Sequence, residues 1–297
     1  MNEKDFPVLY QQSDSRALSN QRNHFRLLKA KIVLLLILAT TASISWNQGS
    51  DFRTAAAFVV GTVLITLMAF TAIEYSRKFD KLWFSCRAVA ESTKKESWLF
   101  MMKVKPYDGT ISEPQAEKLF LDRLEQVLES QQSICSELTP QSENGSQITA
   151  NMRTVRETTV NDRLAYYIDN RVRDQQAWYS KEARKNGSME FRWFISSWVL
   201  QLIAAILAFL VVFSNGLIVN PVGILTTAGV GVLSWMNARS FRELSQSYAL
   251  IAQRLSILGG RKRKASTELD LSEIVIDFEQ AISGEHTIWL ARRLEIP

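Results

Sequence analysis

The stretch WFISSWVLQLIAAILAFLVVF, residues 193–213, contains no acidic or basic side chain. An α-helix rises about 1.5 Å per residue, so this run is long enough to cross a hydrocarbon core roughly 30 Å thick. Three further apolar runs occupy residues 32–46, 55–73 and 217–236. Because only a few residues separate the members of each pair, we predict an all-α membrane protein with two transmembrane hairpins, whose crossings lie at about 28–48, 54–73, 193–213 and 217–236.

The first run, residues 32–46, is shorter than a membrane-spanning helix normally is. Extending it back to Leu27 makes it long enough, because Lys29 and Lys31 can reach the lipid head groups. A cleavable signal peptide is the alternative, since a basic stretch precedes an apolar segment and small residues. We favour a crossing, because the run begins after a polar leader and a second apolar run follows at once.

Basic residues gather at the outer ends of both hairpins, whereas the hairpin turns carry almost no net charge. In the turn 47–54, Arg53 is balanced by Asp51, and the turn 214–220 has no charged residue. Lysine and arginine are enriched in the cytoplasmic loops of membrane proteins. We therefore expect both termini and all long polar segments in the cytoplasm, with the two turns facing outward.

Outside the four apolar runs, apolar residues recur at helical spacing, and strand patterns are almost absent. The sequence therefore predicts long cytoplasmic helices, each with one apolar face. Ser112, with Gln115 three residues later, has the pattern of a capping box at a helix start. We expect the segment 74–102 to continue from the second crossing, because nothing between them breaks a helix. We also expect Asn186–Gly187 to end a helix before the third crossing. The expected polar helices are 74–102, 112–138, 161–185, 237–258 and 272–293.

The order of parts occurs twice along the chain. Each half contains a basic amphipathic helix, an apolar hairpin, a long exit helix, a turn and a further helix. We assign a first two-crossing module to residues 1–139, a polar linker to 140–151 and a second two-crossing module to 152–297. Each hairpin starts and ends on the same side, which differs from the inverted repeats of many secondary transporters.

Composition limits the functions that the chain can have. The net charge is +5, and the bases collect beside the apolar runs, so they fit an anionic membrane surface better than nucleic acid. The dense basic run 261–264 is interpreted as a solvated turn rather than a nucleic-acid or head-group site. Two histidines and two cysteines cannot build a standard zinc site, and no catalytic or phosphate-loop motif occurs. We expect no enzyme activity, no catalytic residue, no cofactor, no metal and no nucleic-acid partner.

Small and hydroxylated residues, rather than charges, mark the apolar runs. Such residues let helices approach closely, and their hydroxyls bond neighbouring helices or their own backbone. Gln201 is the sharpest candidate, because an amide in the middle of a membrane needs a hydrogen-bond partner or water. We interpret the set mainly as helix packing, with a pore lining as the alternative: Ser197, Gln201, Gly223, Thr227, Gly231, Gly61, Thr62 and Thr66.

The segment YSRKFDKLWFSCRAVAESTKKESWLFMMKVKPY, residues 75–107, resembles the core of the SLATT family of bacterial two-crossing membrane proteins. The segment RVRDQQAWYSKEARKN, residues 171–186, and the later EHTIW, residues 285–289, are similar to another branch of that family. The residues on which the likeness depends are Arg87, Glu91, Lys94 or Lys95, Trp98, the pair Pro106–Tyr107, Arg171, Gln175, Trp178, Tyr179, Lys181, Glu285 and Trp289.

The resemblance implies a tandem pair of two-crossing effector modules, of the kind encoded beside nucleotidyltransferases or nucleotide-sensing domains in bacterial defence and conflict systems. The leading hypothesis is therefore a non-enzymatic effector in the bacterial inner membrane. It would form homo-oligomers and permeabilise the lipid bilayer under control of a separately encoded nucleotidyltransferase or nucleotide-sensing protein. The alternative is a non-conducting, membrane-anchored interaction or sensing module. A transporter is less favoured, because no charge marks a site at the middle of the membrane.

Overall fold

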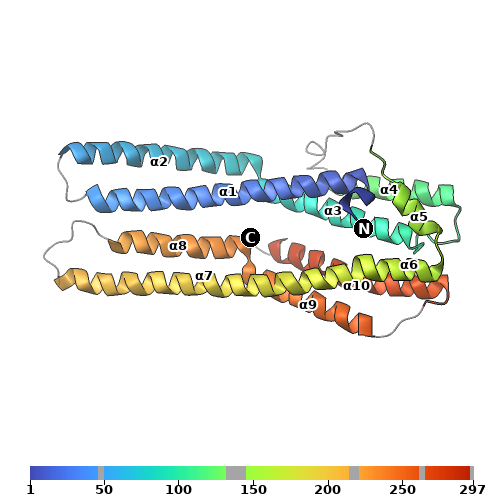
Figure 1. Cartoon of the computed structure of the whole chain (residues 1–297). Helices are drawn as coiled ribbons and strands as arrows, with labels where there is room; N and C mark the ends of the chain where they lie inside the picture. Colours follow the sequence, from blue (N-terminus) through green and yellow to red (C-terminus); the bar gives the residue numbers. More distant parts are fainter. Residues whose placement is uncertain (46–49, 132–144, 214–220, 261–264, 295–297) are drawn as a thin grey trace. The chain divides into compact units, whose positions relative to one another are not determined.

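The computed structural model describes residues 1–45, 50–131, 145–213, 221–260 and 265–294. Within these ranges every regular element is helical, as the sequence predicts (Figure 1). Three helical stretches among them are long and apolar enough to cross a membrane: Val8–Ile44, Asp51–Met101 and Val160–Leu210. The protein is a helical membrane protein. Parts of several sequence predictions lie outside the described residues, namely 47–49, 132–138, 140–144, 214–220 and 261–264.

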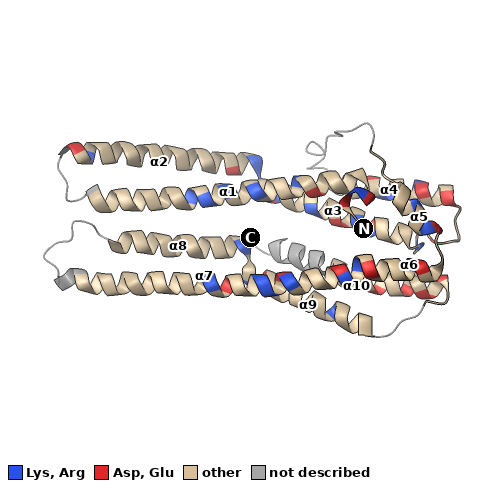
Figure 2. Ribbon diagram, in the orientation of Figure 1, with Lys and Arg blue, Asp and Glu red and all other residues tan. Residues whose placement is uncertain are grey.

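The chain divides into two compact units. The helical body comprises residues 1–21, 80–184 and 246–297, and the hairpin unit comprises residues 22–79 and 185–245. Lys, Arg, Asp and Glu are spread over the helices of the body, whereas the long apolar stretches of the hairpin unit carry few of them (Figure 2). Both halves of the sequence contribute to both units, so neither unit is built from one half alone.

Four long helices supply the hairpin unit: α1 (Val8–Ser45), α2 (Ser50–Arg77), α7 (Arg173–Phe213) and α8 (Pro221–Arg239). α1 and α2 form one antiparallel hairpin, and α7 and α8 form the other (Figure 1). An ion pair between Lys31 and Glu74 joins α1 to α2. The ring of Phe25 on α1 lies 5.6 Å from that of Trp235 on α8, measured between centroids. The two hairpins therefore pack on each other through α1 and α8.

The apolar surface of these helices is exposed. In the most apolar 18-residue segment of each long stretch, the buried share is 0%, 11% and 11% in chain order. The side chains of Phe58 on α2 and Phe209 on α7 are 74% and 72% exposed. An apolar surface of this extent is unfavourable in water and is suited to lipid or other membrane helices. α8 has 19 residues, so it spans roughly 28 Å. The predicted fourth crossing, 217–236, begins in residues outside the description and stays a prediction.

Both exit helices are interrupted directly after the second hairpin helix of each half, so the expected continuous helix through residue 102 is wrong. Lys78, between α2 and α3 (Phe79–Met101), has a left-handed φ of 47°. Ser240, between α8 and α9 (Phe241–Gly260), has the same φ of 47°. This conformation costs a residue with a side chain roughly 1–2 kcal/mol, and glycine normally occupies it. The sequence lacks that glycine, which is why neither break could be predicted.

α7 continues through Asn186–Gly187, where the sequence predicted a helix end. A glycine costs a helix about 1 kcal/mol, and here the packing around it outweighs that cost. A Cβ atom at Gly187 would lie 3.1 Å from the Ser245 hydroxyl oxygen on α9, so the glycine allows α9 to approach. Beside this contact, Arg242 of α9 forms a long ion pair of 3.9 Å with Glu190 of α7. Gly187 is therefore a packing residue and not a helix breaker.

The remaining elements surround one buried core in the body. They are η1 (Glu3–Asp5), α3, α4 (Glu113–Glu129), α5 (Ala150–Glu157), α6 (Val160–Tyr167), the π-helical turn η3 (Ile168–Val172), most of α9, and α10 (Glu268–Leu294). The predicted capping box starts α4, because the Ser112 N–H donates to Gln115 Oε1 at 3.0 Å. Trp98, Phe100 and Tyr167 are completely buried in this core, which positions the site described next.

Candidate functional site

A buried ion pair joins η3 to α10 in the body. Arg171 Nε donates to Glu279 Oε1 at 2.9 Å and Arg171 Nη2 donates to Glu279 Oε2 at 3.0 Å, a two-point contact. The Tyr167 hydroxyl donates to the same Oε1 at 3.0 Å. The Arg171 and Glu279 side chains are 2% and 1% exposed. Burial disfavours the charged guanidinium, but the neighbouring Glu279 raises the pKa of Arg171 above its usual range, so Arg171 stays charged.

Charged side chains from the first half of the sequence form a second set in the body. Arg87 Nη1 on α3 donates to Asp14 Oδ1 on α1 at 2.7 Å. Arg87 Nη2 lies 2.6 Å from Glu91 Oε1, one helical turn further along α3. Two carboxylates, one on α1 and one on α3, therefore hold the Arg87 guanidinium, and the Asp14 contact links the two helices.

Lys94 lies between these two charged sets. Its Nζ is 5.4 Å from the centroid of the Phe6 ring and 5.5 Å from that of the Tyr10 ring, within the range of cation–π attraction. Burial lowers the pKa of Lys94, and the positive charge of Arg171 lowers it further, whereas Glu91 raises it. Charges from both halves of the chain thus affect the pKa of Lys94.

Trp98 connects the two halves through aromatic packing. Its ring lies edge-on to Tyr167 at 5.5 Å and edge-on to Phe6 at 6.2 Å, measured between centroids. Tyr167 is the partner of Glu279 in the buried ion pair. Of the sequence-predicted family-motif residues, Trp98 and Arg171 are therefore buried in the body. Arg87 and Glu91 lie on α3 with partly exposed side chains.

The other motif candidates lie further along α7 and α10. Tyr179 is 3% exposed and its ring lies 5.6 Å from Tyr248 on α9. Trp178 also contacts Tyr248, at 5.2 Å, but it is 42% exposed. Gln175 is half-buried, one turn before Tyr179. Two candidates occupy positions on α10 whose side chains lie outside the description: Glu285 and Trp289.

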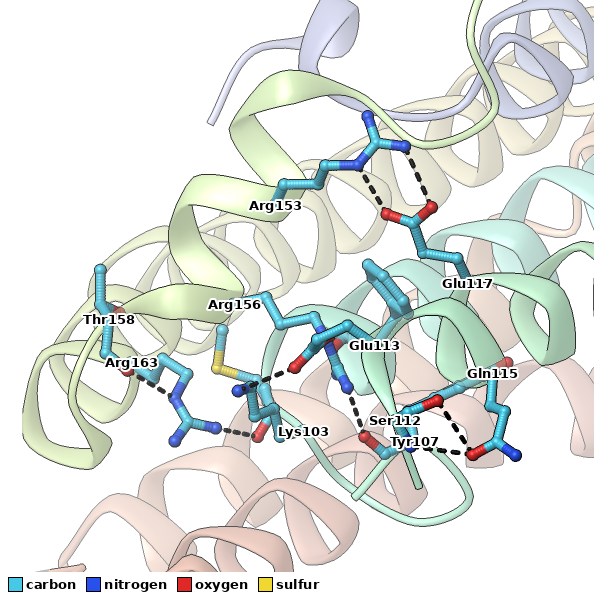
Figure 3. Close-up of polar contacts among 12 residues, drawn as sticks. Lys103, Tyr107, Ser112, Glu113, Gln115, Glu117, Arg153, Arg156, Thr158 and Arg163 are labelled. Atoms are coloured by element: carbon cyan, nitrogen blue, oxygen red, sulfur yellow. Dashed lines mark hydrogen bonds and ion pairs between the residues drawn. The ribbon is translucent and has the colours of Figure 1, made fainter. Parts of the chain in front are cut away.

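An arginine that the sequence analysis did not single out fixes the end of α3 (Figure 3). Arg156 on α5 is 2% exposed, and its Nη1 and Nη2 donate to the carbonyls of Phe100 and Tyr107 at 2.5 and 2.8 Å. Its Nε donates to Glu113 Oε2 at 2.6 Å. The last carbonyls of a helix have no partner within the helix. The guanidinium supplies a second donor to the Phe100 carbonyl, which also accepts from the Lys103 N–H at 3.2 Å, and it ties the segment after α3 to α5 through Tyr107.

Arg163 on α6 has a similar role. It is 2% exposed, and it donates from Nη1 to the Met102 carbonyl at 3.0 Å and from Nε to the Thr158 carbonyl at 3.2 Å. It also forms an ion pair with Glu268 of α10. α5 and α6 are therefore bound to the end of α3. In the sequence these arginines have no spacing that distinguishes them from solvent-exposed bases, so they could not be recognised.

Ser197 and Gln201, two of the candidates for helix packing or a pore lining, contact each other on α7. Gln201 Nε2 donates to Ser197 Oγ at 3.1 Å, and Ser197 is 3% exposed. A Cβ atom at Gly229 of α8 would lie 3.7 Å from Gln201 Cγ, so α8 packs over the stem of this glutamine. Gln201 as a whole is exposed, and its place at a contact in an assembly of hairpins stays a prediction. Gly229 was not predicted as a candidate.

The glycine candidates differ in their surroundings. A Cβ atom at Gly231 would lie 2.8 Å from Cγ2 of Ile32, so this glycine allows α8 to approach α1. A Cβ atom at Gly223 would lie 3.8 Å from Ser43 Oγ, an ordinary contact distance. A Cβ atom at Gly61 on α2 would have nothing within 4 Å. Gly231 is thus a close packing position within the chain, and Gly61 is not.

The hydroxyl candidates bond their own helices rather than neighbouring ones. Thr62 donates to the Phe58 carbonyl, Thr66 to the Thr62 carbonyl and Thr227 to the Gly223 carbonyl, each at 2.8 Å. These bonds satisfy a hydroxyl in an apolar environment without a second helix. The hydroxyls therefore remain on the helix surface, where lipid, water or another copy can reach them.

The polar groups in the body act on one another. The Glu279 carboxylate accepts three hydrogen bonds from Arg171 and Tyr167, which leaves it poorly placed to accept a proton from a substrate. Within the described part of the chain, no three His, Cys, Asp or Glu side chains gather as a metal site requires. The arrangement is chemically suited to joining the halves of the chain through charge and aromatic contacts.

Two family models match the chain in tandem. Residues 7–164 match the model described as SMODS and SLOG-associating 2TM effector domain 3, and residues 167–289 match SMODS and SLOG-associating 2TM effector domain 1. No curated protein and no solved structure matches the chain. The first match includes α5 and the first residues of α6, and with them Arg156 and Arg163, which bind these helices to the end of α3. The chain belongs to the SLATT family and contains two of its two-transmembrane effector domains in one polypeptide.

Proposed function

We propose that this protein is a non-enzymatic effector in a bacterial defence or conflict system, which oligomerises and permeabilises the inner membrane. The two tandem matches to two-transmembrane effector domains support this proposal. The single observation that carries it furthest is the exposure of the apolar helices together with the exposed amide of Gln201. An amide on a lipid-facing surface is unfavourable, and contact with a second copy or with water relieves that cost.

In this proposal four membrane crossings place both termini and the helical body in the cytoplasm. The charge distribution supports this arrangement, because basic residues flank the apolar runs at the ends away from the two turns, and the turns lack a net positive charge. Labelling of single engineered cysteines with an impermeant reagent in intact cells tests it. Positions 48 and 216 are expected to react, and position 145 is expected to react only after the membrane is opened. Labelling of position 145 in intact cells would contradict the topology.

We further propose that the helical body receives the activating signal from a separately encoded nucleotidyltransferase or nucleotide-sensing protein. The chain passes four times between the body and the hairpin unit, after residues 21, 79, 184 and 245. The left-handed residues Lys78 and Ser240 interrupt two of the helices that lead from the hairpins. Because such residues carry conformational strain, they provide places where a change in the body can alter the hairpins.

A non-conducting membrane anchor is the second candidate function. The polar contacts of the body favour it, because the buried Arg156 of the second half pairs with Glu113 of the first half, and a body that joins both halves suits a partner-binding module. Under this alternative the hairpins only hold the body at the membrane, and the hairpin polar groups have no role in ion flow.

Replacement of Gln201 by leucine separates the two functions. We expect the parent protein, expressed in a bacterial host, to depolarise the membrane, and the Gln201→Leu variant to depolarise it more weakly at equal expression. Thr226→Val is a matched control, because the Thr226 hydroxyl is exposed and already bonds the Val222 carbonyl at 2.8 Å. Equal depolarisation by the parent and the Gln201→Leu variant would remove Gln201 from the conduction path. An unchanged membrane potential with the parent itself would favour the anchor.

A further inference from the structure

The two backbone breaks give the two halves of the chain a common reference point. Lys78 and Ser240 have the same φ of 47°, each follows the second helix of a hairpin, and each is followed by a phenylalanine. Matching Phe79 to Phe241 shifts the numbering by 162 residues. Under this shift the buried residues of α3 match buried residues of α9, in the pairs Val89 and Ile251, Ala90 and Ala252, Thr93 and Leu255. The segment α2–α3 is therefore equivalent to the segment α8–α9.

α1 corresponds to α7 in the same way, with a shift of 166 residues. Their buried positions recur at helical spacing and include the same alanine and the same asparagine, in the pairs Ser13 and Tyr179, Ala17 and Ala183, Asn20 and Asn186. The two effector-domain matches in tandem agree with such an internal repeat. Each hairpin helix of the first half thus has a counterpart in the second: α1 in α7, and α2 in α8.

The contacts within the hairpin unit connect its helices in the order α2, α1, α8, α7. An ion pair joins α2 to α1, an aromatic contact joins α1 to α8, and a glycine of α8 packs on Gln201 of α7. Figure 1 shows α2 and α7 at the two edges of the unit. Because α8 is the counterpart of α2 and α7 is the counterpart of α1, this order is one pair of helices repeated in the same sense. If the repeat continued past α7, the next helix would be an α2.

Within the chain, α1 and α8 approach each other at two glycines. A Cβ atom at Gly231 would lie 2.8 Å from Ile32 Cγ2, and a Cβ atom at Gly223 would lie 3.8 Å from Ser43 Oγ. Small residues allow membrane helices to approach in this way. These contacts define the side of α1 that faces α8 and the side of α8 that faces α1.

The corresponding side of α7 is aromatic and exposed. Under the shift of 166 residues, Ile32 of α1 matches Trp198 and Ser43 matches Phe209. The Trp198 side chain is 58% exposed and the Phe209 side chain is 72% exposed. The side of α7 that is equivalent to the contact side of α1 is therefore uncovered at both positions.

The corresponding side of α2 carries small residues and is open. Under the shift of 162 residues, Gly223 of α8 matches Gly61 and Gly231 matches Ala69. Ala69 is exposed, and a Cβ atom at Gly61 would have nothing within 4 Å. The two uncovered sides are complementary in shape, because large rings on α7 can pack over small residues on α2.

We propose that α7 of one copy of this chain packs against α2 of the next copy, with Phe209 over Gly61 and Trp198 over Ala69. This contact repeats between chains the contact that α1 makes with α8 within a chain. It rests on the oligomerisation in the proposed function and names the surfaces that join the copies. Each copy has one α2 edge and one α7 edge, so the contact is head-to-tail, and such contacts close into rings when the rotation between copies allows it.

Disulfide crosslinking of the full-length protein in vesicles of phosphatidylethanolamine and phosphatidylglycerol tests the contact. The double variant Gly61→Cys/Phe209→Cys is expected to give a ladder of dimers, trimers and larger species on mild oxidation. Either single variant alone is expected to give no ladder, because a head-to-tail contact never brings two identical positions together. The native cysteines remain in every variant, so the single variants also report any contribution from them.

Val59→Cys/Phe209→Cys is the matched control. Val59 is 43% exposed and lies two residues before Gly61, about 200° away around the helix axis at nearly the same depth. An equal ladder from this control would show random collision and overturn the proposal.

A bulky side chain at the small position tests the same contact without cysteines. Gly61→Phe is expected to weaken association about tenfold as the ratio of protein to lipid is varied, because the added ring occupies the space that Phe209 needs. Val59→Phe adds the same ring on another side of α2 and should change association less than about twofold. Equal effects of the two substitutions would overturn the proposal. A lysine-reactive crosslinker measures association in both variants.

The same reagents separate failure of this contact from failure of the proposed function. Copies that the lysine-reactive crosslinker joins, without a disulfide ladder in Gly61→Cys/Phe209→Cys, would assemble through another surface, which overturns the contact and leaves the function standing. Copies that neither reagent joins would overturn both. A disulfide ladder in vesicles that keep their ion gradient would support the contact and contradict membrane permeabilisation.

Discussion

Removal of one partner from the buried pair of Arg171 and Glu279 should destabilise the body far more than removal of both. In Glu279→Leu the guanidinium stays buried, at 2% exposure, without its carboxylate. A guanidinium cannot release its proton at ordinary pH, so it cannot escape the cost of burial. We expect a loss of about 3–5 kcal/mol in the free energy of unfolding, which corresponds to a fall in Tm of roughly 10 °C.

The double variant Arg171→Met/Glu279→Leu replaces both charges by apolar side chains of similar size. Such replacements of buried ion pairs are often neutral or stabilising, so we expect Tm within a few degrees of the parent. The single variant Arg171→Met should fall between the two, because a buried carboxylic acid can take up a proton and become neutral. This order distinguishes a charge effect from a cavity effect.

Tryptophan fluorescence during heating of the detergent-solubilised protein measures these differences. Trp98 reports on this core directly, because its ring lies 5.5 Å from that of Tyr167, which hydrogen-bonds to Glu279. A Glu279→Leu variant as stable as the parent would refute the reasoning. So would a double variant that loses as much as the sum of the two single variants, because the pair would then contribute mainly through packing.

Three further predictions concern other parts of the chain. Arg156→Met should lower the unfolding free energy by about 3 kcal/mol, because the buried carbonyls of Phe100, near the end of α3, and of Tyr107, in the segment after it, each lose a donor. The exposed Arg153→Met should lower it by less than about 1 kcal/mol in the same denaturation assay. Gly231→Ala should cost about 1–3 kcal/mol, because its Cβ would lie 2.8 Å from a neighbouring side chain, while Gly61→Ala should be neutral or stabilising in parallel heating curves. Burial lowers the pKa of Lys94, so the folded state loses that proton before the unfolded state does. The stability of the parent relative to Lys94→Met should therefore rise with pH between the lowered pKa and 10.5, and a pH-independent difference would contradict the burial of this charge.

Periodicity and length were sufficient to predict the helical class and the long apolar helices, and a local motif predicted the start of α4. The capping box at Ser112 is local chemistry, and local chemistry is readable from sequence. Three long apolar stretches in the described residues confirm the membrane character. The tandem SLATT resemblance is also confirmed, by matches over residues 7–164 and 167–289.

The features that sequence could not predict depend on contacts between distant residues. Glu279 lies 108 residues after Arg171, and no local pattern marks it as the partner of a buried guanidinium. The break at Lys78 uses a left-handed conformation without a glycine, so the usual signal is missing. Gly187 is the opposite case: glycine normally favours a helix end, but here it lies within α7 and leaves room for the neighbouring α9.

Ion flux through vesicles that contain the purified full-length protein tests the central proposal most directly. The protein would be inserted into phosphatidylglycerol-containing vesicles that hold a potassium gradient, and a potential-sensitive dye would report the decay of that gradient. If the chain is an oligomerising, membrane-permeabilising effector, the rate of decay should rise more steeply than linearly with the ratio of protein to lipid. Vesicles that retain their gradient at every ratio, with insertion of the protein confirmed by protease protection, would contradict it.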